Sequence, residues 1–488
     1  MSVPVDLVSY RDDLEDMMAE ALTEHYDHSA GLKPTMEMTR VYDRYAHLTS
    51  LESALELAAM DAPTELQRFA AEAFVGDGTK QLTDQAANLE AGLTVPFDGS
   101  QVPYRQVRPL LLNEPDAARR RELYRSRCEV TERNLNPVLS ELAERERLLT
   151  AKLGSPTVLS LYERFAFDPA GLATRTDAFL ADTEALYTDE LDRQLHSRLG
   201  VSLGEACPSD LARLMRAPEF DAGFPAERAL PALRETLAGL GIDLDRQPNV
   251  ELDVAARPGK VPRAFCAPIR VPDRVVLVVL PQGGQEDYAA LFHEAGHTEH
   301  FAHARRTLPA EERVLGDNAV TEGFAFLLEH LTGDSRWLAA RLDMPRSDEF
   351  VRFSAFVTLF FLRRYCAKLR YELELHSGAS LPSLPARYAQ LLSSAVGVPY
   401  PESDFLEDVD GGFYCTCYLR AWAFEAQLSD WLRERYGGNW FAQREAGTLV
   451  RELWELGQSL TADALLREVT GQSIDFGVLS DRARDALS

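Results

Sequence analysis

Apolar side chains recur every three or four positions over most of this chain, which is the spacing that places them on one face of an α-helix. Glycine and proline punctuate the repeat, and Pro115 occupies a position typical of a helix start. The breakers are "GLKP" (31–34), "GDG" (76–78) and "DGS" (98–100). The repeat predicts helices at residues 8–26, 41–60, 134–153 and 177–195.

The pattern changes after about residue 205, where extended segments interrupt the helices. Residues 248–257 and 262–269 have an extended pattern, and the β-branched run Val275–Leu280 predicts a strand. A Pro-Gln-Gly-Gly turn ends this strand before helix resumes. We therefore expect a mainly α fold with one small sheet. In sequence order, it should divide into an N-terminal helical lobe, residues 1–205, and a second lobe, residues 206–488, which together form one compact unit.

Composition narrows the class of protein. Of the 488 residues, 45% are hydrophobic and 26% charged, as in ordinary globular proteins. The net charge of −26 argues against nucleic acid or an anionic membrane as partner. The longest apolar run, Phe353–Leu362, is too short to span a bilayer, and the N-terminal segment has no secretory pattern. The six irregularly spaced cysteines indicate reduced thiols, so we expect a cytoplasmic protein.

The helix that follows the predicted strand carries the motif His-Glu-x-x-His, within "LFHEAGHTEH" (291–300). Positions i and i+4 share a helix face, so His293 and His297 can bind the same metal ion. Glu294 is rotated about 100° from His293 and can reach a water molecule without being a ligand. Gly296 predicts close approach of another backbone. His300 is either a substrate contact or a second-layer residue.

A third ligand is available in "GDNAVTEGFAFLLEHL" (316–331), which is predicted to be a helix with one apolar stripe. Glu322 points away from that stripe. It is either a solvated carboxylate or a residue that lines a metal cleft, in which case Asn318 and Glu329 could orient the ligands. The stripe consists of Val320, Phe324, Leu327 and Leu331.

Two histidines and one glutamate leave a fourth coordination position open, which is typical of catalytic zinc. The expected cofactor is one Zn²⁺ per chain, held by His293, His297 and Glu322. Hydrolysis would then use a metal-activated water with Glu294 as general base. The metal that binds depends on the relative affinities of divalent ions for these ligands and on which ions are available, so cobalt and manganese remain alternatives to zinc.

With these motifs in place, the sequence resembles the thimet oligopeptidase and oligoendopeptidase F family of zinc peptidases. The resemblance is strongest in "PGKVPRAFCAPIRVPDRVVLVVLPQGGQEDYAALFHEAGHTEHF" (258–301) and extends upstream to about residue 105. The family places a glutamate ligand 25 residues after the second histidine, and here that position is Glu322.

The resemblance implies a two-lobed helical zincin, with a small sheet beside the active-site helix and zinc at the base of a deep channel. It also implies short unstructured peptides as substrates, which would pair with the strand Val275–Leu280. The motif helix lies in the lobe of residues 206–488.

The chain departs from the family in two places. The family's Pro-Ser-Gln element around the third ligand is replaced by "DNAVTEGFA" (317–325). The family's C-terminal segment, with one His, two Gly and several Tyr, corresponds to "EDVDGGFYCTCYLRAW" (407–422), which puts Asp408 where the histidine would be. Tyr414, Tyr418 and Arg420 are the candidates for substrate contacts and the oxyanion donor, and one alignment favours Tyr418.

Three functions remain open at this point. The first is endopeptidase action on oligopeptides. The second is a catalytically impaired peptide-binding protein on the same scaffold, and the third is a metallocarboxypeptidase. The sequence predicts peptide partners, without nucleic acid or membrane, and leaves the oligomeric state open.

Overall fold

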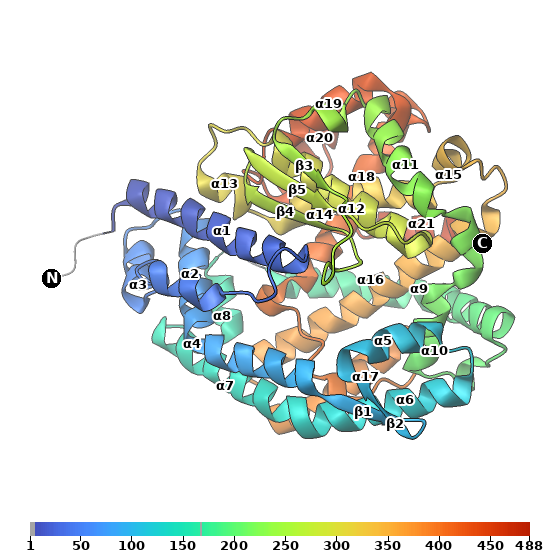
Figure 1. Ribbon diagram of the computed structural model, residues 1–488, viewed down its shortest axis with the longest axis horizontal. Helices are drawn as coiled ribbons and strands as arrows, with labels where there is room; N and C mark the ends of the chain where they lie inside the picture. The colour runs from blue at the N-terminus through green and yellow to red at the C-terminus, as the bar shows by residue number, and fades with distance from the viewer. Residues whose placement is uncertain (1–4, 166–167) are drawn as a thin grey trace. The chain divides into compact units, whose positions relative to one another are not determined.

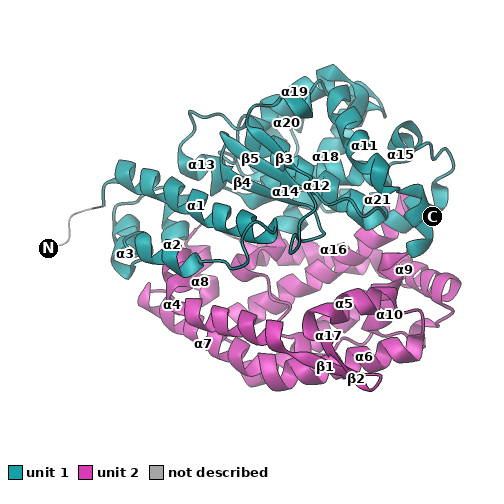
Figure 2. Cartoon of the chain, viewed as in Figure 1, with its two compact units in different colours: residues 1–70, 218–354, 417–482 teal, residues 71–217, 355–416, 483–488 magenta. Residues whose placement is uncertain are grey.

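The computed structural model describes residues 5–165 and 168–488, and most of them lie in helices (Figure 1). The mainly helical fold class is therefore confirmed. The chain divides into two compact units (Figure 2). Unit 1 contains residues 1–70, 218–354 and 417–482, and unit 2 contains residues 71–217, 355–416 and 483–488. The expected division after residue 205 stays a prediction.

Unit 1 is built around a three-stranded sheet with the order β3-β5-β4. The central strand β5 (Arg274–Val278) pairs in parallel with β3 (Val250–Asp253) and antiparallel with β4 (Phe265–Arg270). The β5 strand begins one residue before the predicted run and ends two residues earlier. Because β4 has only one strand neighbour in this sheet, it is an edge strand.

Helices cover this sheet. The first helix, α1 (Leu7–Ser29), packs Ala19 and Tyr26 against Val276 and Val278 of β5. Side chains alternate between the faces of a strand, so Val275 and Leu277, which are also buried, lie on the opposite face. The motif helix α12 (Gln285–His303) packs against β4 and β5.

The remaining helices wholly within unit 1 are α2 (Met38–Arg44), α3 (Leu51–Ala59), α11 (Ala226–Gly239), α13 (Ala310–Val314), α14 (Asn318–Glu329), α15 (Ser335–Leu342), α19 (Arg444–Trp454) and α20 (Ala462–Thr470). Four helices contribute residues to both units: α4 (Thr64–Gly92), α16 (Asp348–His376), α18 (Cys415–Tyr436) and α21 (Gly477–Leu487).

Unit 2 contains α5 (Tyr104–Asn113), α6 (Ala117–Val130), α7 (Asn136–Lys152), α8 (Val158–Glu163), α9 (Pro169–Leu199), α10 (Pro208–Arg216) and α17 (Leu384–Val396). It also contains a hairpin of β1 (Thr94–Phe97) and β2 (Ser100–Pro103) that the sequence analysis missed. Asp98 and Gly99 form its two-residue turn, with φ of 51° and 73°. An Asp-Gly turn is a strong hairpin signal, so "DGS" was a hairpin turn as well as a helix breaker.

Two helix predictions are wrong in detail. Residues 41–60 form two helices, α2 and α3, because the Ser50 side chain accepts a hydrogen bond from the Ser53 amide and starts a new helix. The "GDG" segment lies inside α4 and does not break it. A Cβ on Gly78 would lie 2.6 Å from the Leu149 side chain of α7, so this glycine serves helix packing.

All six cysteines are free thiols, as the irregular spacing indicated. Among the described residues, none of the helices combines the length and hydrophobicity that crossing a membrane would need.

Candidate metal centre

The helix α12 starts at a sharp turn and ends deep in unit 1. Gly283 and Gly284 adopt φ of 81° and 92°, a region that favours glycine. The Asp287 carboxylate, in the first turn of α12, accepts hydrogen bonds from the amides of Gln282 and Gly283. These bonds fix the turn between the β5 segment and the helix. The two motif histidines follow, two and three turns into α12.

The helices α12 and α14 approach each other closely at Gly296. A Cβ on this residue would lie 2.5 Å from the Ala325 Cα and 2.6 Å from the Phe324 carbonyl oxygen. The predicted backbone approach at Gly296 is therefore confirmed. It brings the face of α14 that carries Glu322 next to the two histidines.

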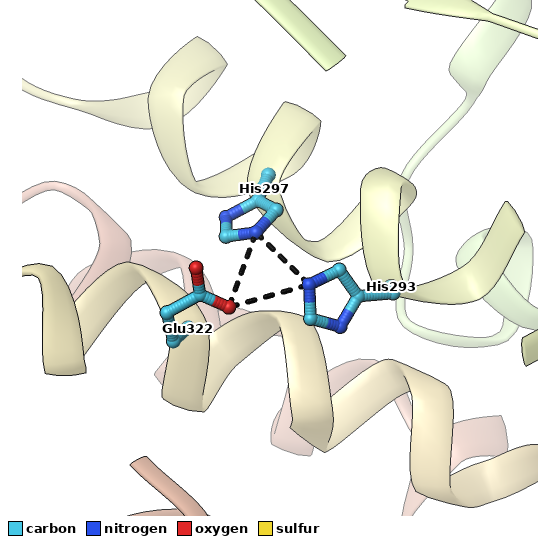
Figure 3. A group of neighbouring side chains, drawn as sticks. All are labelled: His293, His297 and Glu322. Carbon is cyan, nitrogen blue, oxygen red and sulfur yellow. Dashed lines mark hydrogen bonds and ion pairs between the residues drawn. The ribbon is translucent and has the colours of Figure 1, made fainter. Parts of the chain in front are cut away.

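Figure 3 shows His293, His297 and Glu322 pointing toward one another from α12 and α14. The Nε2 atoms of the two histidines are 3.2 Å apart. The Glu322 Oε2 atom lies 3.3 Å from the Nε2 of His293 and 3.5 Å from that of His297. Glu322 is only 3% exposed, which excludes the alternative of a solvated carboxylate.

These three donor atoms fit a zinc ion. Four-coordinate zinc binds nitrogen and oxygen ligands at about 2.0–2.2 Å, so neighbouring ligand atoms of a tetrahedron lie about 3.3–3.6 Å apart. The observed separations of 3.2, 3.3 and 3.5 Å are close to this range. The three residues could therefore supply three of the four ligands of such an ion.

Each histidine has a second partner that orients its ring. The Nδ1 of His293 lies 2.7 Å from the Glu329 carboxylate, and the Nδ1 of His297 lies 2.8 Å from the Thr321 hydroxyl. A carboxylate only accepts hydrogen bonds, so Nδ1 of His293 carries the proton and its Nε2 faces the site. Outer partners of this kind fix the tautomer of metal-binding histidines.

The charges in the site favour a cation. Burial lowers the pKa of His293, but hydrogen bonds and charge from Glu322 and Glu329 outweigh burial and raise it to about 10. Burial raises the pKa of Glu322, while the two histidines hold it well below its usual value. Burial also raises the pKa of Glu329, but His293, His330 and Arg263 together lower it. The carboxylates of Glu322 and Glu329 therefore stabilise a positive charge between the two helices.

Glu294, the predicted general base, is positioned by the edge strand. The backbone N–H of Cys266 in β4 donates to the Glu294 Oε2 at 2.9 Å. The prediction that Val275–Leu280 pairs with substrate is wrong, because β5 is the central strand and already has neighbours on both sides. The edge strand β4 lies beside Glu294 instead.

An aromatic cluster lies next to the metal ligands. The Phe326 ring contacts the His293 ring edge to face at 5.2 Å and stacks on Trp422 at 4.9 Å. Tyr418, one of the candidate donors, has its ring 6.2 Å from that of Phe326 and 6.1 Å from that of Trp422. Tyr418 is half-buried. The structure thus brings Tyr418 into the group of rings that borders His293.

Arg420, a residue of α18, contacts the start of α14. Its guanidinium forms a two-pronged ion pair with Asp317, the residue that caps α14. The Asp317 carboxylate also accepts from the amide of Ala462. Asn318 hydrogen-bonds the Gln458 side chain at 3.1 Å. Glu329 therefore contacts His293, one of the candidate ligands, as the sequence analysis suggested, whereas Asn318 joins α14 to the segment before α20.

Two further residues of the segment 407–422, Asp408 and Tyr414, belong to unit 2. Asp408 accepts hydrogen bonds from Tyr388 and Arg364 and lies 3.4 Å from the Lys368 ammonium. Its carboxylate is thus part of a charged cluster within unit 2. Tyr414 lies just before α18, half-buried, and its role stays a prediction.

His300 is buried on α12, away from solvent. Its Nε2 lies 3.1 Å from the Gly457 carbonyl oxygen, and its ring contacts the Phe324 ring at 5.1 Å. Burial lowers its pKa to about 3, despite the bond to Gly457. A neutral histidine with these contacts packs α12 in unit 1, which supports the second-layer alternative.

Comparison of the chain with protein-family models and with curated proteins found no match. The proposed function therefore rests on the residues of this chain alone.

The sequence analysis missed two groups that contact the candidate site, the Thr321 hydroxyl and the Cys266 amide. Thr321 could have been found from its place one residue before Glu322, because His297 needs a partner there. The Cys266 amide carries no side-chain signal.

Proposed function

We propose that this protein hydrolyses peptide bonds in short oligopeptides with zinc bound by His293, His297 and Glu322. The supporting observation is the triangle of donor atoms, whose sides of 3.2, 3.3 and 3.5 Å fit a four-coordinate zinc ion with one open position. A site closed by four protein ligands would instead be structural. The free thiols favour a reducing compartment, so we place the reaction in the cytoplasm.

Glu294 is the residue that moves the proton in this proposal. Zinc in this site would supply a Lewis acid that polarises the peptide carbonyl and acidifies the attacking water. The Glu294 carboxylate accepts the proton from that water and then delivers it to the leaving nitrogen. The N–H of Cys266 holds one carboxylate oxygen, so the other remains available for the proton.

The substrate would bind along β4. An extended peptide that adds to an edge strand gains backbone hydrogen bonds, which do not depend on its sequence. This mode suits short unstructured peptides and places the backbone beside Glu294. We further propose a two-lobed zincin whose deep channel admits such peptides, as the family resemblance implies.

The oxyanion that develops during attack needs a hydrogen-bond donor. We assign this role to Tyr418, because its ring belongs to the cluster that borders His293. Tyr414 remains the second candidate. Arg420 would act indirectly, because its guanidinium is held by Asp317 and so anchors the helix that carries Glu322.

Metal analysis and turnover test the proposal together. Purified protein should contain about one zinc per chain and should cleave quenched fluorescent peptides, with a chelator abolishing the cleavage. The Glu294→Gln variant keeps the ligands and loses the base, so it should retain zinc and lose activity by at least about a hundredfold.

Glu312→Gln is the matched control, since Glu312 is an acidic residue of α13 in the same unit. It should retain both zinc and turnover. Normal cleavage by Glu294→Gln, or cleavage that survives complete zinc removal, would exclude this mechanism. Zinc binding without turnover in the wild-type protein would favour the impaired peptide-binding protein.

A further inference from the structure

The backbone groups on the outer edge of β4 follow from how β5 divides its own groups between its two neighbours. The amides of Val275 in β5 and of Val279, just after it, donate to carbonyl oxygens on the β3 side, both at 2.9 Å. Backbone groups of successive strand residues point to opposite sides, so Leu277 also faces β3 and the residues between these positions bond β4. Cys266 of β4 lies opposite Leu277. The N–H and C=O of Cys266 therefore point away from β5, to the outer edge.

The same alternation makes Cys266 and Pro268 the outward positions in this part of β4. The Cys266 N–H donates to the Glu294 carboxylate at 2.9 Å, which agrees with its outward direction. Pro268 has no N–H. Proline within a sheet is confined to edge strands and bulges, and Pro268 meets both conditions, because the pairing with β5 is irregular after Ala267. Neither outward position therefore has an N–H that a peptide could use.

The carbonyl oxygens of these two residues remain as hydrogen-bond acceptors. The N–H and C=O of one residue point to the same side of an antiparallel pair, so both carbonyls face outward. Within residues 5–165 and 168–488, no backbone amide donates to the carbonyl of Cys266 or of Pro268. Both residues are half-buried, so a peptide that covers this edge would bury the two oxygens further. A buried acceptor without a donor costs about 1–3 kcal/mol, so the peptide itself must supply the donors.

This edge therefore places unequal demands on the two kinds of group in a peptide backbone. An extended peptide along β4 turns the N–H and C=O of every second residue toward the strand. Its N–H groups meet the two carbonyl oxygens. Its C=O groups meet the amide held by Glu294 and the ring of Pro268, which offer no donor. Parallel and antiparallel ladders both use both kinds of group, so the result does not depend on the direction of the peptide.

We propose that β4 recognises substrates through acceptors alone, so that a peptide must carry backbone N–H groups at two residues that are two positions apart. Proline or an N-alkylated residue at either position lacks the N–H, and such peptides should be rejected. Pro268 is then a specificity-determining residue, because it removes the donor that an ordinary residue would offer there. This inference rests on the proposed peptide hydrolysis and names the class of peptide that the site accepts.

An amide-to-ester scan of one peptide tests the proposal, because an ester replaces a single N–H by oxygen with little change of shape. Zinc-loaded Glu294→Gln protein should bind labelled peptides without cleaving them, and its glutamine keeps an oxygen that can accept from Cys266. Fluorescence anisotropy measures the affinity. Esters at two alternate residues should each weaken binding at least about tenfold, since each leaves one carbonyl of β4 without a donor. An ester at the residue between them should bind as tightly as the parent peptide.

Pro268→Ala, added to the same protein, tests the proline itself. The new N–H can donate to a peptide carbonyl, so the variant should bind the parent peptide about two- to tenfold more tightly. A thioamide at that carbonyl, whose sulfur is a weaker acceptor, should remove the gain and should not affect binding by protein that keeps Pro268. Pro345→Ala is the matched control, because Pro345 is an exposed proline of unit 1 outside the sheet. It should bind every peptide as the unchanged protein does.

Three results would overturn the proposal. The first is an ester scan without alternation between neighbouring residues. The second is weaker binding of a thioamide by protein that keeps Pro268, because a donor of the strand would then hold that carbonyl. The third is a Pro268→Ala protein with unchanged melting temperature, zinc affinity and peptide affinity. If Pro268→Ala does not fold, the two scans on protein that keeps Pro268 still decide.

Turnover of the parent peptide by the wild-type protein keeps the two proposals separate. Hydrolysis together with a uniform ester scan would keep the proposed function and remove recognition through acceptors. An alternating ester scan without hydrolysis would keep the recognition and remove the proposed reaction.

Discussion

At the scale of single residues, the proposed zinc site depends on side chains that are not themselves ligands. Glu329 and Thr321 each contact the Nδ1 atom of one histidine, at 2.7 and 2.8 Å. They decide which nitrogen carries the proton and how each ring is turned. The two candidate histidine ligands were readable from the motif, whereas these partners depend on how α14 lies against α12.

The variants Glu329→Gln and Thr321→Val should each lower zinc affinity by about 10–100-fold, the usual effect of removing such a partner. Glu329→Gln removes the charge and keeps the shape, so its effect should be the larger. Competition with a chelating dye measures both. Thr332→Val is the control, because the Thr332 hydroxyl bonds only a helix carbonyl, that of Glu329. Unchanged zinc affinity in both variants would remove these residues from the site.

A second residue-scale prediction concerns pH and Glu372 in unit 2. Burial raises the pKa of this carboxyl to about 8, although Lys368 and hydrogen bonds from Asp410 and Cys415 oppose burial. In the unfolded chain its pKa is about 4.3. Between these values only the unfolded state releases the proton, so this group makes stability fall as pH rises from about 4 to 8. Above pH 8 the loss is complete.

Glu372→Gln should remove that part of the pH dependence. The melting temperature of the variant, relative to the wild type, should rise between pH 5 and pH 8, by an amount equivalent to at most about 4 kcal/mol. Thermal unfolding at several pH values measures it. A constant difference for Glu372→Gln would contradict the prediction.

At the scale of elements, the crossing of α12 and α14 assembles the site. Gly296 allows the two backbones to approach, and Gly323 of α14 leaves room for the Phe424 ring of α18, which would lie 2.3 Å from a Cβ at this position. Both glycines lie inside helices, where glycine is unfavourable by about 1 kcal/mol relative to alanine. Close packing must offset that cost.

Gly296→Ala should therefore destabilise unit 1, although alanine is the better helix former. The added Cβ meets backbone atoms, which cannot move aside, so we expect a loss of about 1–3 kcal/mol. Zinc affinity should fall as well, because α14 and Glu322 would be displaced. Thermal unfolding and chelator competition measure the two effects. Gly204→Ala is the control, since nothing lies within 4 Å of its added Cβ. A Gly296→Ala protein as stable as wild type would contradict the assigned crossing.

At the scale of the whole molecule, metal binding should be coupled to folding. His293, His297 and Glu322 come from α12 and α14, both within unit 1. A ligand that binds only the folded state stabilises it by about 2.7 kcal/mol at a hundred times its Kd. Zinc should therefore stabilise the folded state of unit 1.

Adding zinc to metal-free protein should raise the melting temperature, and the shift should grow with the logarithm of the zinc concentration. Scanning fluorimetry measures it. His297→Ala removes one ligand and should abolish most of the shift, while His303→Ala, further along α12, should retain it. An equal zinc effect in the His297→Ala protein would place the bound metal elsewhere.

The helical character of the chain, the strand before the motif and the spacing of the three ligands were all predictable from sequence, because they rest on local periodicity. Glu294 directly follows His293 and precedes His297 by three residues, so the arrangement of these three side chains is likewise a property of one helix. The hairpin at Asp98 and Gly99 was also readable, although the analysis missed it. Local rules were enough for each of these features.

Pairing and packing were decided only by the tertiary structure. The sequence indicated a strand at Val275–Leu280 but not that it is the central one; β3 and β4 are the edge strands, and β4 is the one that contacts Glu294. It identified Glu322 but left its burial open, because that depends on α12, α14 and α18 packing together. The contact of Arg420 with Asp317 joins segments that are far apart in the chain. Such contacts follow from the fit of whole elements, which no local pattern encodes.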